Sequence, residues 1–172
     1  MNKGRFLCRF LAAFALLLVG WRWSDASQWC TRGLLAGAGL LGPSLHSWVL
    51  EAPPHGQAVP VWVQGQHRVS ASLQFDALTV GVVPALALLL ATPGLGFRRR
   101  MLLLVVAASL CFAIDTMIVA LFPVLVFYKN PVTDVAGTFL GLIAFVGAPV
   151  IIWFGLTFPQ LRQSLRPFGR KA

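Results

Sequence analysis

Four apolar runs, separated by polar or basic segments, organise this chain of 172 residues. The runs extend over Phe6 to Trp23, Ala77 to about Leu95, Met101 to about Phe122, and Val135 to Phe158. A helix of about 20 apolar residues is long enough to cross a bilayer. We therefore predict an all-α membrane protein with four transmembrane helices. Because the turns between the last three runs are short, these runs should form an antiparallel bundle.

The segment between the first two runs begins with a stretch, residues 24–50, in which Trp and Leu alternate with Gly and Ser. This composition predicts a helix that lies along the outer membrane interface, with a break near Gly42 and Pro43. The Pro53-Pro54 pair should end any helix before it. A fifth membrane span in this stretch is the alternative, but the run is short and Arg32 and His46 interrupt it.

Residues 59–75 follow a different period, because apolar residues alternate on both sides of Gln64-Gly65-Gln66. This two-residue period predicts a β-hairpin between spans 1 and 2. A lone hairpin is only marginally stable in water, so it should rest on the membrane, on the preceding helix or on a partner's sheet edge. Three hairpin residues are candidates for contact with a partner: Trp62, Arg68 and Phe75.

Basic residues are concentrated beside the apolar runs, and their distribution predicts the orientation. Ten of the 14 Lys and Arg residues precede the first run, separate the second from the third, or follow the fourth. They are Lys3, Arg5, Arg9, Arg98, Arg99, Arg100, Arg162, Arg166, Arg170 and Lys171. Cytoplasmic loops carry an excess of Lys and Arg, so both termini should be cytosolic.

The composition excludes most soluble classes. Hydrophobic residues make up 58% of the chain and charged residues 11%, against about 25% charged residues in soluble proteins. The net charge of +9 lies beside apolar spans, where anionic lipids at the cytosolic face, and not nucleic acid, are the expected partners.

These patterns divide the chain into four parts. Residues 1–23 form the first span with its cytosolic N-terminus, 24–75 the outer segment, 76–158 the three-helix bundle, and 159–172 a basic cytosolic tail. The alternative for the first part is a cleaved signal peptide, because a basic start, an apolar stretch and small residues at 24–27 fit that pattern. Cleavage would leave three spans and an outer N-terminus.

Asp115 is the one acidic residue well inside a predicted span. A carboxylate at that depth is costly and is treated as functional by default, although a hydrogen-bonded Asp that helps the bundle to pack is the alternative. Its partner could be Arg22 or Arg68, the hydroxyl of Thr116 or Thr138, or a group on another protein.

Two further sets of residues carry weaker chemical signals. Cys111 lies one turn before Asp115, but a carboxylate and an apolar medium both disfavour a reactive thiolate, so we expect a structural cysteine. His46, His55 and His67 all fall in the outer segment, but their spacings match no compact ligand motif, so a metal site there is a weak candidate. We expect no cofactor.

Small residues and prolines within the spans suggest packing. Gly137 and Gly141 lie one turn apart, which allows close approach of two helices in lipid. Pro84 and Pro149 each release a backbone carbonyl one turn earlier, and such kinks occur in transporters and in static bundles alike.

Four segments together carry a family resemblance. They are VGWRWSDASQW at Val19 to Trp29, LTVGVVPALALLLATPG at Leu78 to Gly94, CFAIDTMIVALF at Cys111 to Phe122, and GAPVIIWFGLTFPQLRQSL at Gly147 to Leu165. The chain resembles the exosortase H-associated membrane proteins, which are small multi-pass accessories of bacterial exosortase systems. The resemblance implies a bacterial inner-membrane location and association with machinery that cleaves C-terminal sorting signals. It implies no catalytic residues in this chain.

We therefore expect a non-enzymatic accessory subunit that docks on a larger multi-pass membrane enzyme of the exosortase type, through the outer segment and the Asp115 face. One alternative is a small membrane enzyme or transporter that uses Asp115 and the outer histidines directly. Another is a structural subunit of an unrelated membrane complex.

Overall fold

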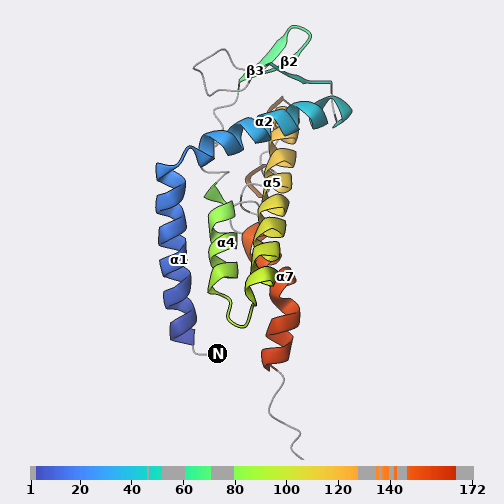
Figure 1. The fold of residues 1–172 in the computed structure, drawn as a ribbon. Coiled ribbons are helices and arrows are strands. Elements are labelled where there is room, and N and C mark those ends of the chain that lie inside the picture. The colour runs from blue at the N-terminus through green and yellow to red at the C-terminus, as the bar shows by residue number, and fades with distance from the viewer. Residues whose placement is uncertain are drawn as a thin grey trace, which may run out of the picture.

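The computed structural model describes residues 3–45, 47–51, 61–70, 80–127, 135, 137–139, 142 and 147–165. These residues form a mostly helical protein with one small antiparallel sheet. Helices α1 (Lys3–Trp23), α4 (Val82–Ala91), α5 (Phe97–Phe127) and α7 (Ala148–Leu165) form an upright bundle, and α2 (Ala26–Leu45) crosses one end of it (Figure 1). The sheet lies beyond α2, so the molecule has a helical body and an outer layer.

Two helices are long and apolar enough to cross a membrane. They cover Gly4–Trp23, with a mean hydropathy of 1.6, and Phe97–Phe127, with a mean hydropathy of 2.5. The other two predicted spans coincide with shorter apolar helices, Val82–Ala91 and Ala148–Pro159. Membrane association is thus supported, whereas the described lengths give two spanning helices and not four.

The ends of the bundle differ in charge. The start of α1, the turn between α4 and α5, and the end of α7 all lie at the end opposite α2 (Figure 1). Arg98, Arg99 and Arg100 stand in the first turn of α5 at this end.

The Arg100 guanidinium donates to the Thr92 carbonyl at 3.1 Å, and the Trp153 indole N–H donates to the Thr92 hydroxyl at 2.9 Å. These bonds join α4, α5 and α7.

Helix α5 continues past Pro123 to Phe127, so the prediction that the third span stops near Pro123 was wrong. Proline removes one backbone hydrogen bond but does not necessarily end a helix when packing holds the next turn. Here the packing comes from the sheet: the Trp62 ring stacks on Phe122 at 5.4 Å, and the Trp48 ring meets Phe127 at 4.9 Å. Tertiary contacts therefore stabilise the extension.

Helix α2 confirms the predicted helix after the first span, although its end differs. It runs through Gly42 and Pro43 to Leu45 without the predicted break. Leu34, Ala38 and Gly42 recur every four residues and are buried, so one stripe of α2 faces the bundle. Pro43 lies in the last turn, next to this stripe and not on it, and little helix remains for it to disrupt.

The outer sheet has three antiparallel strands, β1 (Val49–Glu51), β2 (Val61–Gln64) and β3 (His67–Ser70), in the order β1-β2-β3. Gln64 pairs with His67, which confirms the predicted hairpin over the residues that the structure describes. Gly65 has a φ of +59°, and a positive φ at the first of two turn residues is the pattern of a type II′ turn. Strand β1 was predicted to be helical, and it is a strand because it pairs with β2.

Close approach of α2 and α5 depends on two glycines that the sequence did not single out. A Cβ on Gly33 would lie 3.1 Å from the Phe112 ring, and one on Gly37 would lie 2.8 Å from Thr116 Cγ2. By contrast, a Cβ on Gly137 would meet nothing within 4 Å, and Gly141 lies outside the described residues. The small-residue spacing that brings helices together here is Gly33 with Gly37.

Candidate functional site

Asp115 lies on the buried stripe of α5 and is only 7% exposed. The other buried members of this stripe recur every four residues and are Leu103, Ala107, Cys111, Val119 and Pro123. Side chains four residues apart lie on one face of a helix, so Asp115 occupies a position where its neighbours are apolar or weakly polar. Packing alone would favour an apolar side chain there.

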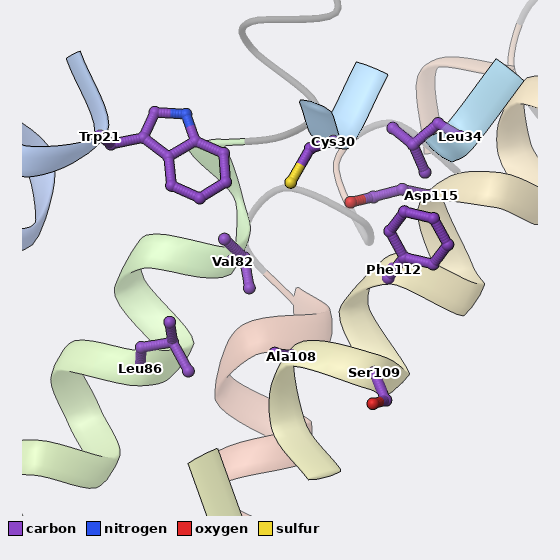
Figure 2. A pocket seen from close by; sticks show the side chains of 9 residues that line it. All are labelled: Trp21, Cys30, Leu34, Val82, Leu86, Ala108, Ser109, Phe112 and Asp115. Atoms are coloured by element: carbon purple, nitrogen blue, oxygen red, sulfur yellow. The ribbon is translucent and has the colours of Figure 1, made fainter. Parts of the chain in front are cut away.

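The Asp115 side chain faces a cavity of about 390 Å³ between α1, α2, α4 and α5. Its described lining is mostly apolar and comprises Trp21, Cys30, Leu34, Val82, Leu86, Ala108, Ser109, Phe112 and Asp115. Figure 2 shows the Asp115 carboxyl and the Cys30 sulfur pointing towards the middle of this space, with the Trp21 ring on the other side. A cavity of this size, mainly apolar with a few convergent polar groups, is typical of a small-molecule site.

Three of the side chains predicted as partners of Asp115 are Thr116, Arg68 and Arg22, and the structure places them in other surroundings. The Thr116 hydroxyl donates to the Phe112 carbonyl at 2.7 Å. Arg68 lies on β3, where its guanidinium is 3.8 Å from the Glu51 carboxylate, and Arg22 is exposed near the end of α1. Within the part of the chain that the structure describes, no hydrogen bond or ion pair reaches the Asp115 carboxyl. The carboxyl is therefore available to a group that enters the cavity.

Trp21 contributes a second polar group without a partner. Its indole N–H is buried and has no acceptor among the described residues. The same side chain also lines a second hollow of about 470 Å³, together with Arg22 and Ser27 at its polar side. Trp21 is thus shared by two hollows, one containing an acidic side chain and the other a basic one.

The cysteines of this region differ from an activated thiol. Burial raises the pKa of the Cys30 thiol above its usual value, and the Asp115 carboxylate adds a smaller effect in the same direction. Activation needs a nearby cation or imidazole, and the described lining of the cavity contains neither. Cys111 is buried in α5 beside Asp115. Neither thiol has the surroundings that nucleophilic chemistry requires.

Of the three histidines proposed for metal binding, the structure describes only His67. His46 and His55 lie outside the described residues, and His67 is exposed on β3 with its ring 5.3 Å from Phe127. Phe127 follows Asp115 by twelve residues, or about 18 Å along the helix. Among the described residues, no three His, Cys, Asp or Glu side chains are close enough to hold a metal ion.

The three docking candidates have different surroundings. Trp62 is only 1% exposed because its ring packs on Phe122, so it supports the sheet from inside the fold. Arg68 is exposed beside Glu51, and Phe75 lies outside the described residues. Of the three, Arg68 is the one that the structure places on an accessible surface. The Asp115 carboxyl, the other part of the predicted docking face, lines the cavity between α1, α2, α4 and α5.

Sequence reasoning identified Asp115 but not the residues opposite it. The sequence patterns gave neither Trp21 nor Cys30 a role in a site. The crossing of α2 over the bundle brings Cys30 to the Asp115 cavity, and the end of α1 supplies Trp21. No sequence spacing encodes this arrangement. Comparison of the chain with protein-family models, curated proteins and solved structures found no match.

Proposed function

We propose that this chain is a four-span accessory subunit of the bacterial inner membrane, with both termini cytosolic. The placement of the basic segments supports this orientation, because the start of α1, the first turn of α5 and the end of α7 lie at one end of the bundle (Figure 1), and the sequence has Lys or Arg in or beside each of them. The exposed side chains of α1 also fit a lipid environment. They are large and apolar along the helix, at Leu7, Leu11, Leu16, Leu18 and Val19.

The attachment of the outer sheet to α5 is the observation that supports the accessory role. A three-stranded sheet of this size buries little surface of its own. Trp48 and Trp62, each 1% exposed, fix it to Phe127 and Phe122 at the end of α5. These contacts fix the position of the sheet relative to the end of α5.

The β3 edge is the surface that we propose for docking. Within the described residues no further strand pairs with β3, so its outer backbone groups can accept a strand from another protein. From this edge strand Arg68 reaches across β2 to Glu51 on β1, and this pair is solvent-accessible, with exposures of 71% and 49% for the two side chains. Such an exposed ion pair would orient a docking partner more than it would increase the affinity for that partner.

The partner that we propose is a larger multi-pass enzyme of the exosortase type. This proposal rests on the resemblance of the four sequence segments to the exosortase H-associated family. The docking geometry alone requires only a membrane protein with a strand or loop on the outer side, level with the sheet. The accessory role assigns no catalytic residue to this chain.

Site-specific photocrosslinking in native membranes tests the docking surface. A photoreactive residue in place of Arg68 should crosslink to one multi-pass enzyme in near-stoichiometric yield. The matched control is the same residue in place of Phe97, which is 78% exposed at the opposite end of the bundle and should give no such product. Equal crosslinking from both positions, or none from position 68, would contradict docking through β3.

A further inference from the structure

We propose that the two hollows that share Trp21 in their lining bind the head group of an aminophospholipid from the outer leaflet. In this arrangement the primary ammonium pairs with Asp115 in the inner cavity, and the phosphate is held by Arg22 and the Trp21 indole N–H. This site needs no partner protein, so it goes beyond the proposed docking role. It depends only on the placement of the bundle in a bilayer.

The inner cavity supplies the acidic half of the site. Asp115 is 93% buried, has no described partner and points into the space (Figure 2). A buried carboxylate is strongly disfavoured unless a cation or donors pair with it. A primary ammonium offers three N–H donors and a full positive charge, which is the chemistry that this carboxyl lacks among the described residues.

The outer hollow supplies the basic half. Arg22 lines it, and a guanidinium is well suited to phosphate oxygens. The Trp21 N–H is a buried donor without an acceptor, so a phosphate oxygen would satisfy it. Leu18 and Val19 line the same hollow and are exposed on α1, where they offer an apolar path for the acyl chains.

The depth of the site fits a lipid head group. Helix α5 has 31 residues and is about 46 Å long, against about 30 Å for the hydrocarbon core. If Arg100 marks the cytosolic boundary, the outer boundary falls about 20 residues later and Asp115 lies about 8 Å below it. The exposed Trp23 and Trp29 stand near that boundary, as interfacial aromatics do.

The charge arrangement selects among lipids. Phosphatidylglycerol has the phosphate but no ammonium, so it would leave Asp115 unpaired. Phosphatidylcholine has a cation without N–H donors, and its three methyl groups increase the size of the head group. Phosphatidylethanolamine matches both halves, and one charge-assisted hydrogen bond corresponds to about tenfold in affinity.

Native mass spectrometry of the full chain in detergent, titrated with lipid, tests the proposal. The wild-type protein should bind phosphatidylethanolamine about tenfold more tightly than phosphatidylcholine, with the monomethyl and dimethyl lipids in between. Asp115→Asn should remove this preference, whereas Asp25→Asn, at an exposed turn outside the cavity, should keep it. Arg22→Gln should weaken the binding of both lipids equally, whereas Arg32→Gln should leave the binding of both unchanged.

Two results would overturn the site. One is equal binding of phosphatidylethanolamine and phosphatidylcholine by the wild-type chain, which needs no variant and so decides the question even if Asp115→Asn does not fold. The other is a lipid preference that survives in folded Asp115→Asn. Because no partner is present in this measurement, failure of the docking proposal leaves its outcome unaffected.

Discussion

Replacement of Gly37 by alanine tests the packing of α2 on α5 most directly. The added Cβ would lie 2.8 Å from Thr116 Cγ2, closer than van der Waals contact allows. Thr116 cannot turn away freely, because its hydroxyl donates to the Phe112 carbonyl at 2.7 Å and its side chain is buried. Overpacking of this kind costs about 1–3 kcal/mol. Alanine also gains up to about 1 kcal/mol over glycine in a helix.

Gly39→Ala is the matched control, two residues further along the same helix. A Cβ there would meet only Leu50 Cδ2, at 3.9 Å, which is an ordinary contact. Both substitutions gain the same helix propensity and restrict the unfolded chain equally, so these contributions cancel in the comparison. We therefore expect Gly37→Ala to have a free energy of unfolding about 1–3 kcal/mol below that of Gly39→Ala.

The measurement is SDS-induced unfolding in mixed micelles, followed by far-ultraviolet circular dichroism. Thr116→Ser provides a rescue, because it removes Cγ2 and keeps the hydroxyl that bonds to Phe112. The double variant should recover most of the loss, giving a coupling energy of about 1 kcal/mol or more. If Gly37→Ala and Gly39→Ala are equally stable to within about 0.5 kcal/mol, the helices do not approach as closely as described.

Three further outcomes follow from the same contacts. Trp62→Ala should cost about 3–5 kcal/mol locally, and hydrogen exchange should then show β2 and β3 losing protection while the middle of α5 keeps it. Trp153→Phe removes the N–H that bonds to the Thr92 hydroxyl, so the free energy of unfolding should fall by about 1 kcal/mol in the same SDS titration; no change would mean that water replaces this bond. Cys30, with the other two cysteines replaced by alanine, should react slowly with a maleimide at pH 8 and still accelerate above pH 9, because burial raises the pKa of its thiol. Labelling of the SDS-unfolded chain provides the reference rate, and an equal rate in the folded chain would exclude burial of the thiol.

Local sequence patterns were sufficient to predict the elements that depend on neighbouring residues. The two-residue alternation around Gly65 predicted the β2–β3 hairpin, since the turn needs a residue that tolerates a positive φ. Hydropathy predicted the helices at Gly4–Trp23 and Phe97–Phe127 because the apolar length of a run is itself the physical requirement. A helix in the region of α2 was also predicted, although not its end.

Features that depend on distant residues could not be predicted in this way. Pro123 looks like a stop signal, but α5 continues beyond it, where the rings of Trp48 and Trp62 pack on Phe127 and Phe122. Strand β1 looks like the end of a helix until β2 is available to pair with it. Gly33 and Gly37 are two of several small residues in α2, and their role emerges only when Phe112 and Thr116 lie opposite.

The sequence alone identified Asp115, but its surroundings depend on distant residues. These surroundings favour a functional interpretation of Asp115 over a packing role. The sequence shows a carboxyl in an apolar run, where insertion costs about 2.5–3.5 kcal/mol. If this residue served helix packing, α2 should supply it with a partner, but the tight contact with α2 is made by its neighbour Thr116. The carboxyl instead faces a cavity that Trp21 also lines, and the buried indole N–H of Trp21 has no acceptor among the described residues. Among the described residues this acceptor and this donor do not meet each other, and a bound molecule that carries the complementary groups would satisfy both.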